Sequence, residues 1–458
     1  MRTNFRSHQL TDPHTKEAEK ALRTCVHCGF CTATCPTYLV LGDERDGPRG
    51  RIVLMQTMLE SGGPPTAETV KHLDQCLSCL GCKTACPSGV DYSALIEKSR
   101  GYIEENFRRP LGDRLFRDFI LFVLTRPKLF SVMAGLGRVF APVASRLPGK
   151  LGVMARKAVV KNPSTLAPSV RFADTSPASG GGMRSPSPVT TGEESRARVL
   201  LLPGCVQRVL APQTDDAAAR VLARQGLRVE ALPKTGCCGA LAYHMGKTKE
   251  GKEHARAILR AFESEQAKGG VDGVIMTASG CSAFLKEYVR VFADEPEWKA
   301  RAEAFVAKVK DFTEVARPAT AVVLADAPVI AYHPPCSLQH GQRVIGRGEA
   351  LLKEAGFKLA PIPDAHLCCG SAGSYSLLHP EIANELRTRK LAAIRSTGAG
   401  MIASANIGCL THLSGDMPTV HIAELLDWAA ENAQSNLPGR APSTASRSPS
   451  PVTTGEEN

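Results

Sequence analysis

Apolar residues follow two different spacings along this chain. In the first hundred residues they recur at helical intervals, as in residues 51–60 and 66–77. From about residue 197 onward, short apolar runs are each followed by a turn rich in small residues and then by a helical pattern. These runs are residues 199–202, 274–277, 329–332 and 401–403. Strand, turn and helix repeated in this order predict parallel α/β sheets that follow a helical N-terminal part in the sequence.

Shifts in composition predict where these parts begin and end. The chain has 458 residues, enough for about three domains. A linker and a tail rich in Ser, Pro and Gly are expected to be disordered, and both contain the segment RSPSPVTTGEE, to which we assign no chemistry. The predicted parts are a helical domain (1–100), a basic helical connecting region (101–174), the linker (175–196), two α/β domains (197–315 and 325–435) and the tail (436–458).

The cysteine content narrows the chemistry. No apolar run approaches the roughly 18 residues of a membrane span, and the first twenty residues lack the features of a secretory signal, so the expected compartment is the cytoplasm. Cytosolic thiols stay reduced, so the 16 cysteines point to metal binding, catalysis or burial rather than to disulfides. They form two groups of eight, separated by the cysteine-free residues 87–204.

The net charge of +11 is concentrated in one stretch of the chain. Residues 100–161 contain 13 Lys or Arg against four Asp or Glu, interleaved with Phe116, Phe119 and Phe122. This mixture predicts a basic amphipathic region that faces an acidic partner or an anionic membrane surface. A solvated helical linker whose apolar residues pack locally is the alternative. No motif for reading a nucleic-acid groove is present, so no nucleic-acid partner is expected.

The first eight cysteines repeat one motif. Cys-x2-Cys-x2-Cys-x3-Cys-Pro occurs at residues 25–36 and again at 76–87, which is the bacterial ferredoxin spacing. In two-cluster ferredoxins the fourth cysteine of each run binds the other cluster. The predicted ligands are therefore Cys25, Cys28, Cys31 and Cys86 for one [4Fe–4S] cluster, and Cys76, Cys79, Cys82 and Cys35 for the second. Zinc is the competing interpretation, but a zinc site needs neither the third cysteine nor the Cys-Pro step.

The second eight cysteines belong to a duplicated pattern. Cys205, Cys237, Cys238 and Cys281 form copy one, and Cys336, Cys368, Cys369 and Cys409 form copy two. In both copies 31 residues separate the first cysteine from the Cys-Cys-Gly step. Ligands of parallel sheets sit beyond the carboxyl ends of the strands, so the four cysteines of a copy should gather at one edge. They could hold a further cluster, form a redox site or simply be buried; His412 has ligand-like spacing from Cys409.

These observations give the expected fold class. It is an α+β multidomain protein with an N-terminal helical ferredoxin-type domain that holds two [4Fe–4S] clusters. Two tandem α/β cysteine-rich (CCG) domains follow. No Gly-x-Gly-x-x-Gly follows a strand, so neither a flavin site nor a catalytic residue is expected on this chain.

The order of motifs resembles the iron–sulfur subunits of respiratory 2-hydroxy-acid and glycerol-phosphate dehydrogenases and the heterodisulfide reductases. Several strings narrow the resemblance to the iron–sulfur subunits of bacterial glycolate oxidase (glycolate dehydrogenase). They are CVHCGFCTATCPTYL (25–39), DGPRGRI (46–52), TASGCSAF (277–284), CSLQH (336–340), HLCCGSAG (366–373) and ANIGCLTH (405–412). The resemblance covers residues 15–173 and 197–433.

This resemblance implies a complex. FAD-containing subunits oxidise glycolate to glyoxylate, and this chain passes the electrons to a quinone or similar acceptor from the cytoplasmic face of the inner membrane. A lactate or glycerol-3-phosphate dehydrogenase, and a heterodisulfide-reductase-like thiol/disulfide enzyme, remain the alternatives. Heterodisulfide-type domains end in Cys-x2-Cys, whereas Phe284 and His412 stand at the last position here. A five-thiolate site is therefore excluded in both copies, and a four-ligand site remains open.

Overall fold

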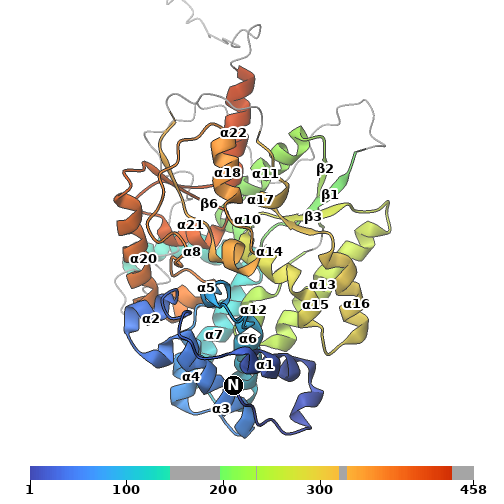
Figure 1. Cartoon of the computed structure of the whole chain (residues 1–458). Helices are drawn as coiled ribbons and strands as arrows, with labels where there is room; N and C mark the ends of the chain where they lie inside the picture. Colours follow the sequence, from blue (N-terminus) through green and yellow to red (C-terminus); the bar gives the residue numbers. More distant parts are fainter. Residues whose placement is uncertain (145–195, 234, 319–326, 436–458) are drawn as a thin grey trace, which may run out of the picture.

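The computed structural model describes residues 1–144, 196–233, 235–318 and 327–435. The predicted tail (436–458), nearly all of the predicted linker (175–196) and the end of the basic region lie outside the described residues. In Figure 1 the N-terminal helices lie at the bottom, the first sheet domain (green to yellow) on the right and the second (orange to red) on the left.

The N-terminal domain is helical, as the apolar spacing predicts. Asp12 begins the first helix by accepting hydrogen bonds from the backbone N–H groups of His14 and Thr15. Pro36 occupies the first position of the second helix, so the Cys-Pro step of the first cysteine run starts that helix. The elements are η1 (Gln9–Thr11), α1 (Pro13–Thr24), α2 (Pro36–Leu41), η2 (Glu44–Asp46), α3 (Pro48–Ser61), α4 (Ala67–Asp74), α5 (Gly81–Ala85) and α6 (Tyr92–Asn106).

Two further helices, α7 (Leu111–Leu124) and α8 (Pro127–Ala144), form the described part of the basic region. Ile120 and Leu121 on α7 are buried against Ala242, Met245 and Leu378 of the sheet domains. Among the described residues, no single helix has the length and apolarity to cross a membrane. The adjoining segments Leu111–Leu124 and Pro127–Gly137 meet those criteria only as a pair, and that pair is bent by 107°.

The first sheet domain contains four parallel strands in the order β2-β1-β3-β4. Its predicted strands 199–202 and 274–277 correspond to β1 and β3. The elements are β1 (Arg198–Leu201), α10 (Gln207–Leu210), α11 (Gln213–Arg224), β2 (Arg228–Ala231), α12 (Ala240–His244), α13 (Thr248–Gln266), β3 (Gly273–Met276), α14 (Ser279–Lys286), α15 (Tyr288–Val291), α16 (Pro296–Val306), β4 (Val309–Asp311) and α17 (Phe312–Val315).

The second sheet domain repeats this topology. Its strands are parallel in the order β5-β6-β7, and Leu359 pairs with Ile330 at the position that β2 has in the first sheet. The elements are β5 (Ile330–Tyr332), the π-helical turn η5 (Ser337–Gly341), α18 (Arg347–Glu354), α19 (Tyr375–Leu378), α20 (Pro380–Arg395), β6 (Met401–Ser404), α21 (Ile407–Leu413), β7 (Thr419–His421) and α22 (Ile422–Ser435). The predicted α/β copies are therefore confirmed as parallel sheets.

The two sheet domains pack against each other through equivalent helices. Helix α11 of the first domain packs on α22 of the second, where Arg220 and Arg224 both bind Asp427. Helix α18 of the second domain packs on α17 of the first, where Arg347 donates to the carbonyl of Ala316 at 2.9 Å. Buried apolar residues of both domains, among them Leu222 and Leu426, form one continuous core.

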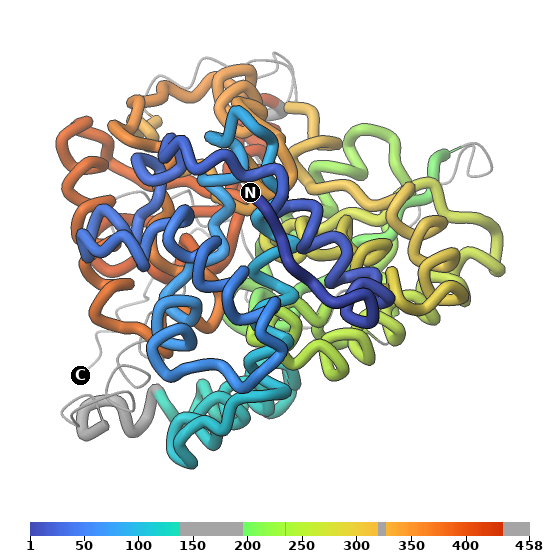
Figure 2. Tube along the Cα trace, turned by 60° about the horizontal axis from the view of Figure 1, so that its bottom comes forward, coloured from blue at the N-terminus to red at the C-terminus, as the bar shows by residue number. Residues whose placement is uncertain are grey.

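The N-terminal domain lies across both sheet domains (Figures 1 and 2). Against the first domain, the guanidinium of Arg290 binds Glu97 at 2.8 Å and Ser93 at 2.9 Å. Against the second domain, the hydroxyl of Tyr375 donates to the carbonyl of Gln75 at 3.0 Å. The helical domain therefore has a fixed position relative to both copies of the cysteine pattern.

Candidate iron–sulfur centres

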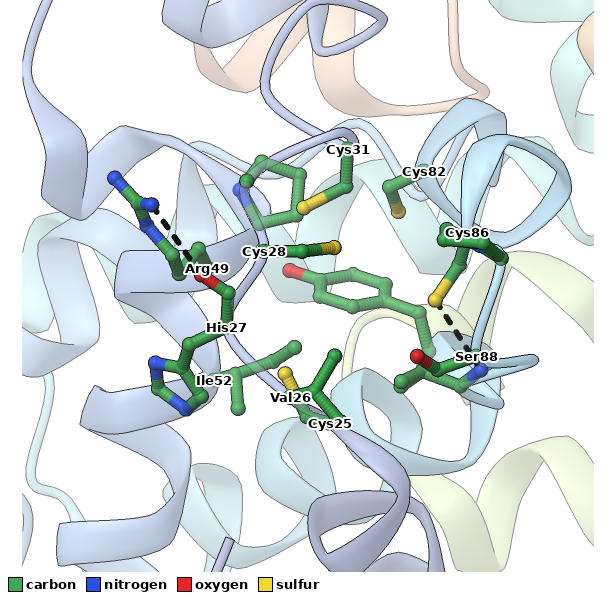
Figure 3. Close-up of a pocket in the computed structure, with 15 residues that line it drawn as sticks. Cys25, Val26, His27, Cys28, Cys31, Arg49, Ile52, Cys82, Cys86 and Ser88 are labelled. Atoms are coloured by element: carbon green, nitrogen blue, oxygen red, sulfur yellow. Dashed lines mark hydrogen bonds between the residues drawn. The ribbon is translucent and has the colours of Figure 1, made fainter.

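The first group of cysteines surrounds a cavity near the surface (Figure 3). Cys25, Cys28 and Cys31 of the first run and Cys86 of the second line a space of about 430 Å³, together with Cys82. Figure 3 shows the sulfur atoms of these residues directed toward the middle of that space. Cys28 is exposed, so this cavity reaches the outside of the molecule.

A second, smaller cavity collects the other four predicted ligands. Cys35, Cys76, Cys79 and Cys82 line a space of about 290 Å³. Cys35 therefore sits with the second run and Cys86 with the first, which is the exchange that the ferredoxin rule describes. Cys82 lines both cavities, so the two spaces are neighbours.

Tight backbone turns aim N–H groups at the sulfur atoms. His27, Ser78 and Leu80 have positive φ angles of 57°, 53° and 62°, which non-glycine residues adopt rarely. The backbone N–H of Ser78 donates to Sγ of Cys76 at 3.4 Å, and that of Val90 donates to Sγ of Cys86 at 3.5 Å. Such donors stabilise the thiolate form that binds metal and tune a cluster's potential.

A buried arginine supplies positive charge to the second cavity. The side chain of Arg51 is only 1% exposed and donates hydrogen bonds to the carbonyl of His72 and the hydroxyl of Thr37, at 2.8 and 3.0 Å. It also lies 3.9 Å from Sγ of Cys35. Burial raises the pKa of Cys76, but the charges of Arg51 and Arg100 outweigh it, so the pKa falls below its usual value.

Two other thiols of the second cavity are hard to ionise. Burial, with the nearby sulfur atoms adding to it, raises the pKa of Cys79 and of Cys82 well above the usual value. Metal ligation deprotonates such thiols because the ion supplies the missing positive charge. The donor atoms, the two spaces and the N–H groups therefore fit a pair of iron–sulfur clusters.

The cysteines of each sheet domain gather at one edge, as the topology predicts. In copy one, the thiols of Cys237 and Cys281 contribute to raising the pKa values of Cys205 and Cys238, so these four side chains lie close together. In copy two, Sγ of Cys336 lies 3.8 Å from Sγ of Cys368. Sγ of Cys369 lies within 4.8 Å of Sγ of Cys409.

Backbone conformation explains why a glycine follows each Cys-Cys pair. Gly239 and Gly370 have φ angles of 94° and 93°. A Cβ atom at Gly239 would lie 2.5 Å from the carbonyl oxygen of Gly251, and one at Gly370 would lie 2.6 Å from that of Ala383. The Cys-Cys-Gly step therefore needs glycine both for its backbone angle and for the close approach of the following helix.

The second sheet domain is the one whose cysteines pack with a cysteine of the ferredoxin runs. Among the apolar clusters of the described residues, no cluster joins a copy-one cysteine to those runs. Cys79 of the second cavity belongs to the same apolar cluster as Cys336 and Cys368. His340 joins the two domains there, with its ring nitrogens 2.8 Å from Oγ1 of Thr84 and 3.0 Å from the carbonyl of His366. Copy two is therefore the copy that faces the second cavity.

The histidine that the spacing favours has a backbone partner on a neighbouring helix. Nε2 of His412 lies 3.1 Å from the carbonyl oxygen of Ala383 on α20. Instead, His333 places a ring nitrogen within 4.8 Å of the Sγ atoms of Cys369 and Cys409, which are also within that distance of each other. The sequence signal for His333 is its place directly after β5, at the carboxyl edge of the sheet.

Two known protein families match parts of this chain. The family described as "4Fe-4S dicluster domain" matches residues 21–90, and the family described as "Cysteine-rich domain" (CCG) matches residues 199–286 and 330–414. The glycolate oxidase iron–sulfur subunit of Escherichia coli K12 is 38% identical over 94% of this chain and 100% of its own length. The chain belongs to the glycolate oxidase iron–sulfur subunit family.

Other relatives agree over smaller parts. A protein from Bacillus subtilis, named a probable glycolate oxidase iron–sulfur subunit, is 33% identical over 90% of this chain and 95% of its own length. Lactate utilization protein A of Geobacillus kaustophilus is 30% identical over 50% of this chain and 98% of its own length. Among solved structures, a hypothetical protein from Helicobacter pylori aligns over 91% of this chain and 72% of its own, with 11% identity and a TM-score of 0.47, too distant to inform the argument.

Family membership confirms several expectations. The chain is the electron-transferring iron–sulfur subunit of an oxidoreductase complex with partner subunits, and its cofactors are iron–sulfur clusters. The assignment of individual cysteines to clusters stays a prediction, to which the two cavities give a geometric basis.

Proposed function

We propose that this chain carries electrons from flavin-containing subunits, which oxidise glycolate to glyoxylate, to a quinone or similar acceptor. The observation that carries this proposal is the pair of adjoining cavities with exchanged fourth cysteines. When bound, iron–sulfur clusters take up and release single electrons. The cysteines of the two adjoining cavities would hold the clusters, and Arg51 and the backbone N–H groups would stabilise the thiolate ligands.

We infer that the flavin subunit docks over the first cavity. Cys28 at this cavity is exposed, and the neighbouring side chains of Val26 and Phe30 are each 68% exposed. The buried core of a protein interface is more apolar than the rest of the surface, so exposed apolar side chains beside this cavity fit a docking site. The second cavity is the inner one, since Cys79 packs with residues of the second sheet domain.

The substrate is tested in the complete complex. Glycolate, lactate and glycerol 3-phosphate are each added anaerobically, and reduced-cluster signals are followed by electron paramagnetic resonance. Glycolate should give the signals of two interacting clusters within one turnover. A complex that is reduced by lactate or glycerol 3-phosphate, and not by glycolate, would contradict the assignment of substrate.

The helix α7 supports a peripheral membrane contact. Its outward face carries Leu111, Leu115, Phe119 and Phe122, spaced as neighbours on one side of a helix. The surrounding stretch is strongly basic, and Arg126 lies over the ring of Phe122 at 4.1 Å. We therefore place this face on the anionic, cytoplasmic surface of the inner membrane.

Changing Leu115 and Phe122 together to glutamate should weaken binding to vesicles containing anionic lipid by at least about tenfold, because each buried side chain contributes about 1.5–3 kcal/mol. Co-sedimentation with phosphatidylglycerol vesicles measures this. Val53→Glu on α3, another exposed apolar position, is the matched control and should bind as the wild type does. Equal binding by the double variant would remove this face from the membrane contact.

A further inference from the structure

We propose that the second cysteine-rich domain binds a single zinc-class metal ion through the Sγ atoms of Cys369 and Cys409 and a ring nitrogen of His333. This site is separate from the two ferredoxin cavities. Its three donors come from different places in the domain. His333 follows β5, Cys369 lies in the Cys-Cys-Gly step, and Cys409 lies on α21.

The first argument is the state of the His333 side chain. It is completely buried, at 0% exposure, and within the described residues neither Nδ1 nor Nε2 has a hydrogen-bond partner. Leaving a buried polar group without a partner is unfavourable, and nearly all buried polar groups in native proteins have one. Other buried histidines of this domain are paired: His412 with the carbonyl of Ala383, and His421 with that of Thr277. A metal ion would satisfy one nitrogen of His333 directly.

The second argument is the distance between the donors. All three ligand atoms lie within 4.8 Å of one another. In a tetrahedral site with Zn–S of about 2.3 Å and Zn–N of about 2.0–2.1 Å, neighbouring donors are about 3.5–3.8 Å apart. The ligands of a [4Fe–4S] cube bind different irons and are therefore further apart. The spacing thus favours one ion over a third cluster, and thiolate with imidazole is a donor set typical of zinc.

The third argument comes from the duplication. His333 stands three residues before the first cysteine of copy two, and the corresponding residue three before Cys205 is Leu202. Leu202 is buried at the same edge of its sheet. Copy one therefore has the cysteines without the imidazole, and the metal site belongs to copy two alone. Copy one also shows that leucine is compatible with the fold at this position.

The test is the metal content of the full chain, purified anaerobically. The wild type should contain about eight irons, as two [4Fe–4S] clusters require, and about one zinc. His333→Leu should keep the eight irons and lose the zinc. Cys281→Ser, which removes the copy-one counterpart of Cys409, is the matched control and should keep the zinc. X-ray absorption at the zinc edge of the wild type should show sulfur neighbours and one imidazole, a result that does not depend on how any variant folds.

Four results would each overturn the site. They are a wild type without zinc, about twelve irons with matching sulfide, zinc lost equally from His333→Leu and Cys281→Ser, or a zinc shell without imidazole nitrogen. These readouts are independent of glycolate oxidation, so their failure and the failure of the proposed function are distinguishable.

Discussion

Cys28→Ser should abolish reduction of the acceptor by the complex while leaving reduction of the flavin by glycolate intact. Cys28 is an exposed member of the first cavity, so its replacement removes a cluster ligand without opening a hole in the core. In the proposed complex the flavin and the substrate are bound by the partner subunits, so their reaction should not require the clusters. Stopped-flow absorbance measures flavin reduction, and dye reduction under steady state measures transfer through this chain.

Cys79→Ser should give the same pattern, because it lines the second cavity and the clusters act in series. Gel filtration of each variant complex shows whether the subunits remain together. Loss of flavin reduction in an intact complex would mean that the clusters take part in the chemistry of the substrate. Unchanged acceptor reduction would mean that electrons leave the flavin by another route.

Arg51→Met should lower the free energy of unfolding by about 3–5 kcal/mol, the usual cost of removing one partner from a buried ion pair. Its guanidinium binds Thr37, the carbonyl of His72 and the carboxylate of Asp46, all of them buried. The substitution keeps the volume of the side chain but leaves these groups unpaired. Urea denaturation under anaerobic conditions, followed by cluster absorbance and by circular dichroism, measures the effect.

Arg51→Lys should rescue little of this loss, because an ammonium cannot reproduce the fork of hydrogen bonds. Arg45→Met is the matched control: Arg45 pairs with Asp43 while half exposed, and its loss should leave the midpoint nearly unchanged. A purely structural role predicts a change in stability only. Positive charge near Cys35 and Cys76 additionally predicts a lower reduction potential of the second cluster in Arg51→Met. Unchanged stability and potential would refute both roles.

Features that depend on neighbouring residues, such as the cysteine runs and the strands, could be predicted because their patterns lie within short stretches of sequence. The cysteine spacing predicts which residues wrap a cluster, and the predicted exchange of Cys35 and Cys86 follows from a general rule. Alternation of apolar runs and turns located β1, β3, β5 and β6. Helix 66–77 was predicted too long: α4 covers only Ala67–Asp74, because the chain must turn before Cys76.

Long-range placement had no such signal. Thr84 and His340 are in contact although they are 256 positions apart in the sequence. Neither segment carries a pattern that predicts this contact, so the sequence does not indicate that copy two faces the second cavity. The spacing of His412 from Cys409 likewise gives no sign of the carbonyl partner that the structure records for His412. One turn along α21 carries the side chain about 5 Å further, to a carbonyl of α20. His333 lies near Cys369 and Cys409 because it directly follows β5, at the carboxyl edge of the sheet where these cysteines gather.

The reciprocal packing of the two sheet domains has an evolutionary consequence. Helix α11 packs on α22 while α18 packs on α17, so each copy gives the other the same kind of contact, as the subunits of a two-fold symmetric dimer do. The duplicated pair is in this sense a dimer fused into one polypeptide. Each copy remains necessary as a folding partner even when its own cysteines change role. One copy is then free to acquire an imidazole while the other keeps a leucine, and neither change separates the pair.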